Sequence, residues 1–482
     1  MPSTTMSFFT DMVQQIADRG RSLMGGRRLG EGSSEDLRRM AEELLSNRGE
    51  ASSVARASVL LECYATATID ARAGFLLSLA QDFGPEEAAI AKAMEAYSAE
   101  PGPRKAMALH LAAEPRRQEL FRKLNRAPNG TLSLVRMRED VISLMKTHPP
   151  LADVDADFQH LFNSWFNRGF LALRRIDWSS PAIVLEKIIQ YEAVHRIENF
   201  EDLKTRLAPE DRRLYAFFHP ALVEEPLIFV EVALTRSVPG AIPHILAVDR
   251  ETIPARDATT AVFYSISNCQ KGLAGVSFGN FLIKQVVEEL RRDLPQLRTF
   301  LTLSPVPGFV AWIRAQLADF DSPFLDPEER VALEPWFAPD VDEQNISESN
   351  LDEDEQELQA ESLSEALGNS MREPIRALAA TYLARAKSVS GARGVERPKD
   401  PVARFHLGNG ARLEHVHALA DMSPRGLAQS AGIMVNYLYD LDTIERNHEA
   451  YAERGEIAMS NEVKRLAKPQ SAFREVAGAR GA

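Results

Sequence analysis

The sequence predicts an all-α helical bundle followed by a domain of the α/β or α+β class. Amphipathic helical patterns fill the first third of the chain, and a Pro149-Pro150 pair ends that part. Beyond it, apolar β-branched runs alternate with helical segments, which is typical of a sheet covered by helices. We therefore expect a helical domain over residues 1–150, a second domain over 151–470 and a disordered tail over 471–482.

The helical part begins with a clear start signal. Ser33 and Asp36 have the spacing of a capping box, in which side chains satisfy the free N–H groups of a first helical turn. Apolar residues then recur at helical spacing at positions 37, 40, 41, 44 and 45, and similar patterns fill residues 54–69, 73–83 and 86–97. No titratable cluster lies here, so we expect a structural role in oligomerisation or docking.

The second part contains four predicted strands, at residues 226–235, 260–267, 298–303 and 402–407. Helices are expected at 157–173 and 180–189. Residues 341–366 hold ten acidic residues and no basic one, which is typical of a solvated, mobile insertion rather than a partner-binding segment.

Composition excludes several classes of protein. A formal net charge of −13 over 482 residues disfavours nucleic acid as a partner, although a local basic patch can still bind an anion. Cys63 and Cys269 are the only cysteines, which rules out a disulfide network and a cysteine zinc site, and fits a reducing cytoplasm. The sequence contains neither a membrane-length apolar run nor a secretory signal pattern, so we expect no membrane association.

The segment 262–309 carries the first indication of a ligand. A β-rich run leads into a turn with Gly272, Gly275 and Gly279, then a helical run, then a second β-rich run that ends in Ser304-Pro305. Glycines before a helix let backbone N–H groups approach a phosphate, and the helix N-terminus adds positive potential. This order points to an acyl carrier such as CoA or to a nucleotide. The same glycines also fit a plain connection between a strand and a helix.

A second segment, residues 400–441, adds further motifs. YSIS, QKGLAGVSFGNFLIK, LSPVPGF, FHLGNGA and RGLAQSAGIMVNYLY, in this order, resemble the malonyl-CoA decarboxylases. The resemblance covers residues 153–441 well and the helical part more loosely. It implies a catalytic domain built like the GNAT acetyltransferases, and conversion of malonyl-CoA to acetyl-CoA and CO2 without metal, biotin or another cofactor.

The resemblance also implies a setting. Members of this family associate through their helical domains, so we expect a homo-oligomer, a dimer or a tetramer. Animal members carry organelle signals that this sequence lacks, which suggests a bacterial, cytoplasmic protein. The activity would belong to malonate catabolism or to the control of malonyl-CoA in fatty acid metabolism.

The reaction defines what its site requires. Loss of CO2 leaves an enolate, so the thioester oxygen needs hydrogen-bond donors and the C2 atom needs a proton. His406 occupies the position of the family's catalytic histidine in FHLxNGA, and Ser304 that of the serine paired with it in SPxPGF. An ordinary imidazole pKa of about 6.5 suits proton donation near neutrality. Ser265 and Tyr439 match two further active-site positions. Without the resemblance, each of these residues fits a plain structural role equally well or better.

The resemblance places the CoA pyrophosphate on the glycine-rich turn, ahead of a helix over residues 281–290. The binding residues it implies are Ala274, Gly275, Val276, Ser277, Phe278, Gly279 and Asn280. The turn departs from the usual acetyltransferase pattern, because its first glycine comes one residue early. Lys271 and Lys284 lie where they can meet phosphate charge, or can be surface lysines.

Two other functions stay open at this stage. A GNAT-type acyltransferase would share the CoA turn, but would move the acyl group to an amine and release free CoA. A non-catalytic CoA-binding or scaffolding protein would bind CoA without turnover.

Overall fold

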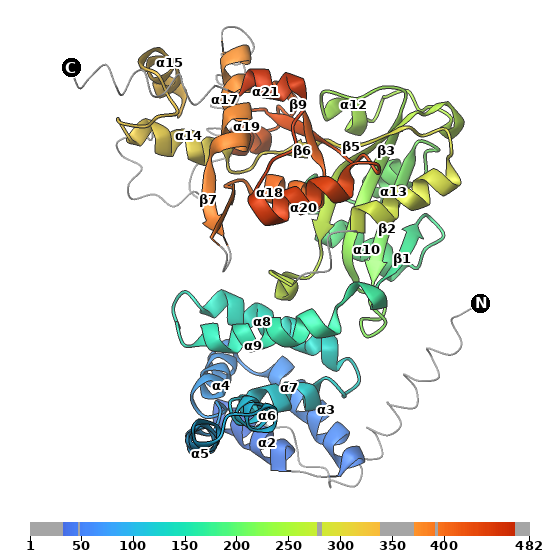
Figure 1. Ribbon diagram of the computed structural model, residues 1–482. Coiled ribbons are helices and arrows are strands. Elements are labelled where there is room, and N and C mark those ends of the chain that lie inside the picture. The colour runs from blue at the N-terminus through green and yellow to red at the C-terminus, as the bar shows by residue number, and fades with distance from the viewer. Residues whose placement is uncertain (1–31, 47–48, 277–281, 338–370, 391–393, 468–482) are drawn as a thin grey trace, which may run out of the picture. The chain divides into compact units, whose positions relative to one another are not determined.

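The computed structural model describes residues 32–46, 49–276, 282–337, 371–390 and 394–467 (Figure 1). The chain forms two compact units. One comprises Met1–Ala172, Phe217–Ile228 and Asn268–Gly279, and the other Leu173–Ala216, Phe229–Ser267 and Asn280–Ala482. The acidic segment 341–366 and the tail 471–482, which we expect to lack regular structure, lie outside the described residues.

The first unit is helical, as the sequence predicts. Its helices are α2 (Ser34–Ser46), α3 (Glu50–Thr66), α4 (Ile69–Gln81), α5 (Glu87–Ala99), α6 (Pro103–Ala112), α7 (Arg116–Leu124), α8 (Gly130–Leu144) and α9 (Leu151–Trp165). The predicted cap is present, because the Asp36 N–H donates to Ser33 Oγ at 3.2 Å and the Ser33 hydroxyl donates to the Asp36 carboxylate at 2.8 Å. Helix α2 then buries Leu37, Ala41 and Leu44, which confirms the helical spacing.

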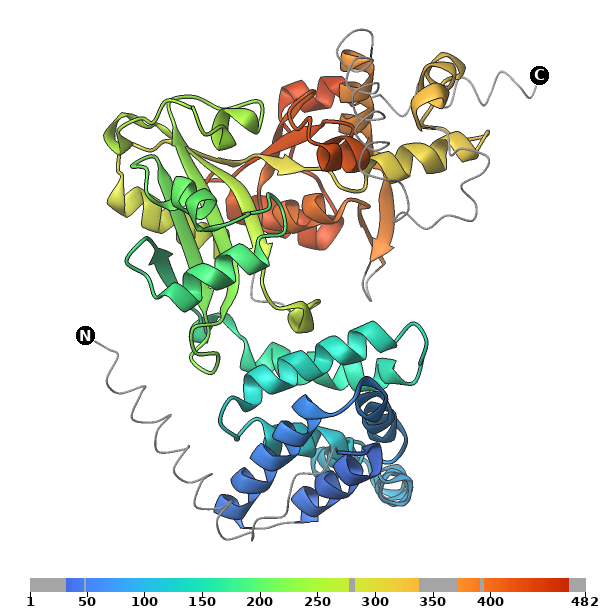
Figure 2. The same ribbon diagram turned by 180° about the vertical axis from the view of Figure 1, so that it is seen from behind.

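Helices α8 and α9 lie side by side in both views (Figures 1 and 2). On α9, Phe158 stacks on Phe121 of α7 with ring centroids 4.1 Å apart. Arg138 of α8 forms a buried ion pair with Asp155 of α9 at 2.7 Å, and it also donates to the carbonyl oxygen of Gly272 at 2.8 Å. One buried guanidinium therefore ties the segment after β4 to the helical core.

The chain also forms an eight-stranded sheet. Seven strands follow the order β1-β2-β3-β4-β5-β10-β6, and the eighth, β9, pairs with β10. The strands are β1 (Ala172–Ile176), β2 (Arg212–Phe218), β3 (Pro226–Thr235), β4 (Thr260–Asn268), β5 (Thr299–Thr302), β6 (Ser304–Pro305), β9 (Arg412–His417) and β10 (Met434–Leu438). Strand β5 runs parallel to β4, whereas β10 is antiparallel to β5, β6 and β9. Val262, Leu301 and Met434 from the three central strands share one apolar core.

The sheet is accompanied by helices and a small hairpin. The helices are α10 (Ala182–Tyr191), α11 (Phe200–Leu207), α12 (Pro243–Leu246), α13 (Leu282–Asp293), α14 (Phe309–Ala318), α15 (Pro327–Phe337), α17 (Arg372–Arg385), α18 (Pro401–Gly408), α19 (Pro424–Ser430), α20 (Ile444–Arg454) and α21 (Asn461–Leu466). Strands β7 (Lys387–Ser390) and β8 (Val395–Pro398) form a separate antiparallel pair. Across the described ranges, no helix has both the length and the apolar character needed to cross a membrane.

Three of the four predicted strands are confirmed as β3, β4 and β5, and the fold class of a helical part plus a sheet domain is confirmed with them. The strand predicted over 402–407 is wrong, because these residues form α18. Asp400 caps this helix by accepting the Ala403 N–H at 2.8 Å, and Pro401 occupies its first position. An Asp-Pro start signal thus outweighs the apolar run that follows it.

The predicted helix over 157–173 is also displaced. Helix α9 begins earlier, at Leu151, and ends at Trp165, and its expected end belongs to β1. The helix predicted over 180–189 is confirmed as α10.

Gly272 supplies a test of the helical packing. A Cβ atom at this position would lie 1.9 Å from the carbonyl oxygen of Val135 on α8. We expect Gly272→Ala to lower the free energy of unfolding by about 1–3 kcal/mol, because the backbone must move to relieve the overlap. Urea unfolding followed by circular dichroism measures this loss.

Gly84→Ala is the matched control, since a Cβ atom there would meet no atom within 4 Å. Equal stability of the two variants would contradict the close contact between Gly272 and α8.

Candidate active site

His406 lies on α18 and is 3% exposed, and both of its ring nitrogens have a partner. Nε2 lies 3.2 Å from Ser304 Oγ, and Nδ1 lies 2.7 Å from the Tyr439 hydroxyl oxygen. The structure thus brings together three of the four predicted catalytic residues. They come from three elements, since Ser304 is on β6 and Tyr439 directly follows β10.

Ser304 has a second partner that the sequence reasoning missed. Its hydroxyl donates to Thr302 Oγ1 at 2.9 Å, and the backbone N–H of Tyr437 donates to the same Thr302 oxygen at 3.1 Å. Thr302 is fully buried. Alternate residues of a strand point to the same face, so a serine two positions after a buried threonine was the available signal.

Burial changes the acid–base character of the histidine. Removal from water lowers the pKa of His406 to about 3, because the protein interior disfavours the imidazolium. The ordinary value near 6.5, which we expected to suit proton donation, therefore does not apply. Burial also raises the pKa of the Tyr439 hydroxyl well above its usual value, so this group keeps its proton. At neutral pH the site holds a neutral imidazole between two hydroxyl groups.

The imidazole is also held by packing. The Tyr437 ring stacks on it, with centroids 4.6 Å apart and an angle of 22° between the rings. Tyr437 of β10 is buried and lies two residues before Tyr439, which directly follows the strand. A neutral imidazole with a fixed ring plane can donate a hydrogen bond to one hydroxyl group and accept one from the other.

Ser265 belongs to a different hydrogen-bond cluster. Its hydroxyl lies 2.7 and 2.8 Å from the two carboxylate oxygens of Glu192, which directly follows α10. Ser267 donates to the same carboxylate at 3.1 Å, and the backbone N–H groups of Val194 and His195 each donate to it at 2.8 Å. Glu192 was missed, because no sequence motif contains it.

Ser265 is nevertheless a neighbour of the histidine site by register. Phe263 of β4 pairs with Thr302 of β5 in the parallel ladder. Ser265, within β4, and Ser304, the first residue of β6, each follow this pair by two residues. The Glu192 cluster therefore fixes the Ser265 side chain beside the strand that leads to Ser304.

The glycine-rich turn is described in part. Ser277, Phe278, Gly279 and Asn280 lie outside the described residues, so the predicted phosphate contacts there stay predictions. Gly275 has φ of +76°, a conformation that favours glycine, and Ala274 and Val276 flank it. The predicted helix follows as α13. Position 272 must be glycine because a side chain there would overlap with α8. This contact explains why the first glycine of the turn comes one residue earlier than in the usual acetyltransferase pattern.

One of the two lysines near this turn is already paired with a carboxylate. Lys284 on α13 forms an ion pair with Glu445 of α20 at 2.7 Å. In the parts of the chain that the structure describes, no cluster of three or more His, Cys, Asp and Glu side chains could hold a metal ion.

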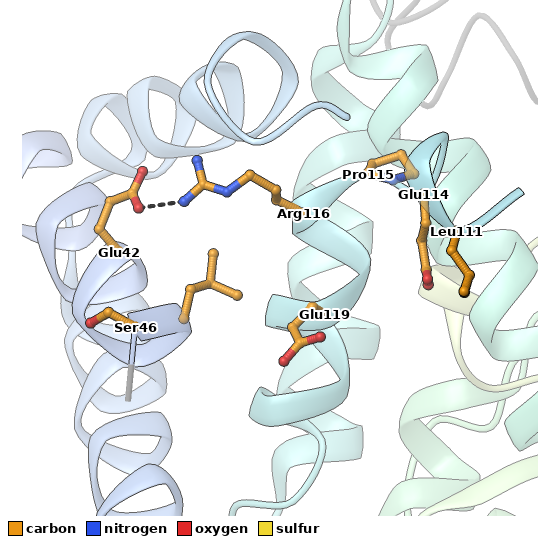
Figure 3. Close-up of a pocket in the computed structure, with 8 residues that line it drawn as sticks. Glu42, Ser46, Leu111, Glu114, Pro115, Arg116 and Glu119 are labelled. Carbon is orange, nitrogen blue, oxygen red and sulfur yellow. Dashed lines mark hydrogen bonds and ion pairs between the residues drawn. The ribbon is translucent and has the colours of Figure 1, made fainter. Parts of the chain in front are cut away.

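A pocket of about 410 Å³ occurs in the helical unit (Figure 3). Its lining includes Glu42, Glu114 and Glu119, and its single cation, Arg116, is paired with Glu42 at 2.6 Å. A net negative lining repels the phosphate groups of CoA, so this pocket does not suit such a ligand.

Two family models match this chain. The model of the malonyl-CoA decarboxylase C-terminal domain matches residues 169–477, and that of the N-terminal domain matches residues 83–166. The chain belongs to the malonyl-CoA decarboxylase family. The mitochondrial malonyl-CoA decarboxylase of Anser anser anser is 37% identical over 409 residues, which cover 81% of this chain and 79% of the goose protein. The Rattus norvegicus enzyme is 34% identical over 370 residues, 74% of this chain and 72% of its own.

Solved structures of the family align with most of this chain. The crystal structure of malonyl-CoA decarboxylase from Rhodopseudomonas palustris has a TM-score of 0.80 at 53% identity, and covers 90% of this chain and 99% of its own. The Agrobacterium vitis structure has a TM-score of 0.77 at 52% identity, and covers 90% and 100% of the two chains. The chain thus has the two-domain architecture of this decarboxylase family.

The lowered pKa of His406 predicts a pH dependence of stability. The unfolded chain takes up a proton on this imidazole below a pKa of about 6.5, whereas the folded chain does so only near pH 3. Stability is therefore lost as the pH falls from 6.5 toward 3. Between pH 7 and pH 5, wild-type protein should lose about 2 kcal/mol more unfolding free energy than His406→Asn.

Urea unfolding at the two pH values measures the difference. His110→Asn, at an exposed position on α6, should keep the wild-type pH dependence. Identical pH dependence in wild type and His406→Asn would contradict a neutral, buried imidazole.

Proposed function

We propose that this chain converts malonyl-CoA to acetyl-CoA and CO2 without a metal or another cofactor. The observation that carries the proposal is the buried His406 between Ser304 and Tyr439, at 3.2 and 2.7 Å, in a chain of the malonyl-CoA decarboxylase family. The mitochondrial relatives that the chain resembles bear this activity in their names. The groups present supply protons and hydrogen bonds, which is what the reaction requires.

In the proposed reaction, the bond between C2 and the free carboxylate breaks and its electron pair passes to C2 and the thioester oxygen. CO2 leaves, and an enolate remains. The Ser304 hydroxyl gives its proton to C2, and His406 returns a proton to Ser304. A solvent proton restores the imidazole, so the reaction consumes one proton in each turnover.

A neutral His406 suits these reaction steps. An imidazolium at this place would put a positive charge in a buried position, so the ring starts neutral and hydrogen-bonded to Tyr439. After it gives its proton through Ser304, the ring carries the negative charge that came from the enolate, and the solvent proton then neutralises it. The Tyr439 hydroxyl donates to the nitrogen that carries the electron pair. A positioned proton donor is worth about 10²–10⁴ in rate.

CoA binding is assigned by the family resemblance to the turn at residues 274–280. The positive φ of Gly275 and the start of α13 at Leu282 support this assignment, because a glycine turn ahead of a helix is the usual arrangement for binding phosphate. The N–H groups of Ala274 and Val276 donate to the carbonyl oxygens of Lys271 and Leu273. Ser265, held by Glu192 beside the strand that leads to Ser304, would support the substrate or the Ser304–His406 pair.

We further propose that the protein forms a homo-oligomer, a dimer or a tetramer, through its helical unit. Helices α5 and α6 bury none of their residues, and Met94, Met107 and Leu111 on them are 56%, 57% and 60% exposed. Apolar side chains exposed to this degree are stabilised by association. Sedimentation velocity measures the oligomeric state.

A cytoplasmic location is proposed on two grounds. Cys63 and Cys269 form no disulfide in the described residues, which suits a reducing compartment, and the related proteins of known structure come from bacteria. There the reaction would serve malonate catabolism or limit the malonyl-CoA used in fatty acid metabolism.

The test of function uses purified, chelator-treated protein incubated with malonyl-CoA, with acetyl-CoA followed by mass spectrometry. Wild type should form acetyl-CoA, and His406→Ala and Ser304→Ala should each lower kcat by about a hundredfold or more, because each removes a member of the proton path. Unfolding midpoints show whether the variants remain folded.

Two outcomes would overturn parts of this proposal. Intact malonyl-CoA with folded wild type would exclude the decarboxylase, and acyl transfer to an added amine with release of free CoA would then favour an acyltransferase. Full activity in folded His406→Ala would keep the reaction and exclude the assigned proton path.

A further inference from the structure

Thr302 occupies a break in the hydrogen bonding between adjacent strands. Strand β10 pairs with β5 at Leu438 and Leu301, and with β6 at Val435 and Ser304. Between these two pairs, the chain of β10 contacts Thr302 through side-chain hydrogen bonds. The register of β10 against β9 also shifts at this point, between Asn436 and Tyr437.

Two bonds from β10 hold Thr302 in place. The Tyr437 N–H donates to Thr302 Oγ1 at 3.1 Å, and Asn436 Nδ2 donates to the Thr302 carbonyl oxygen at 2.7 Å. Thr302 and Asn436 are both fully buried. The position of Oγ1 is therefore set by the same strand whose Tyr437 ring stacks on His406.

With Ser304 as the hydrogen-bond donor to Thr302, the hydrogens on Ser304 and His406 follow. A serine hydroxyl has one hydrogen, and that of Ser304 points to Thr302 Oγ1 at 2.9 Å. The Ser304 oxygen must then accept the hydrogen bond from His406 Nε2, which lies 3.2 Å away. A neutral imidazole carries one N–H, so Nδ1 is bare and accepts from the Tyr439 hydroxyl at 2.7 Å.

The hydrogens take the opposite positions if residue 302 has no oxygen that can accept the Ser304 hydroxyl hydrogen. The Ser304 hydroxyl would then donate to Nε2, the imidazole hydrogen would lie on Nδ1, and Tyr439 would accept it. In that tautomer Nε2 has no proton to return to Ser304, so the path from His406 through Ser304 is interrupted.

We propose that Thr302 is a positioning residue that selects the Nε2–H tautomer of His406 by accepting the Ser304 hydroxyl hydrogen. This inference rests on the proposed decarboxylase function. Before the reaction, Thr302 holds the Ser304 hydrogen. When the enolate forms, the hydroxyl turns to C2, and the Nε2 hydrogen is already on the side of Ser304.

Thr302→Val and Thr302→Ser test the proposal with malonyl-CoA as substrate. Valine has nearly the shape of threonine but no acceptor, so kcat should fall about tenfold or more while KM stays within about twofold. Serine keeps the acceptor, and its kcat should stay within about threefold of wild type. Thr381→Val is the control, since Thr381 is equally buried and its hydroxyl donates to Ala377 within α17.

A second measurement reads the tautomer without catalysis. In protein labelled with 15N-histidine, the His406 signals, assigned from their loss in His406→Asn, should show Nε2–H in wild type and in Thr302→Ser. They should show Nδ1–H in Thr302→Val. If valine prevents folding, Thr302→Cys replaces it, because a thiol keeps similar bulk and is a weak acceptor.

The outcomes separate the two proposals. Wild-type kcat in folded Thr302→Val, or an unchanged tautomer in that variant, would overturn the role of Thr302. An equal loss of kcat in Thr302→Ser would overturn it as well, because the acceptor is retained there. Failure of wild type to decarboxylate malonyl-CoA would refute the proposed function, and the 15N spectra would still test the tautomer.

Discussion

The site depends on the way β10 meets the segment from β5 to β6. Main-chain pairing holds β10 at Leu438 and again at Val435, and the side chains of Thr302 and Asn436 bridge the interval between them. A ladder of main-chain bonds alone would use the Tyr437 N–H without involving Thr302 Oγ1. Because the bridge uses a side chain, a hydroxyl group is fixed next to Ser304 in the interior of the protein.

Helix α18 supplies the other half of the site. Its start is set by the Asp400 cap and by Pro401, and its first turns bring His406 to Ser304 and Tyr439. The helix ends at Gly408, two residues beyond the histidine. A strand over the same residues would place alternate side chains on opposite faces, so the cap is what determines the position of the imidazole.

The burial of His406 keeps its imidazole neutral, and it lowers the stability of the folded protein at low pH. Complete removal of His406 from water keeps the ring neutral, and hydroxyl groups on both sides satisfy its two nitrogens. Such a buried network disfavours a positive charge on the ring. The Glu192 carboxylate next to the neighbouring strand is different, since two serine hydroxyls and two backbone N–H groups satisfy it.

The sequence by itself determined the helical part, three central strands and the family, because these depend on local periodicity, on a capping signal and on long motifs in order. Motif matching also identified Ser304, His406 and Tyr439 as candidates, although nothing in their spacing shows that they meet. Tertiary structure alone decided that His406 meets Ser304 and Tyr439, that Glu192 holds Ser265, and that the pKa of His406 is low. These properties arise from contacts between residues 33 to 102 positions apart in the chain, or from burial, and neither is encoded in local sequence.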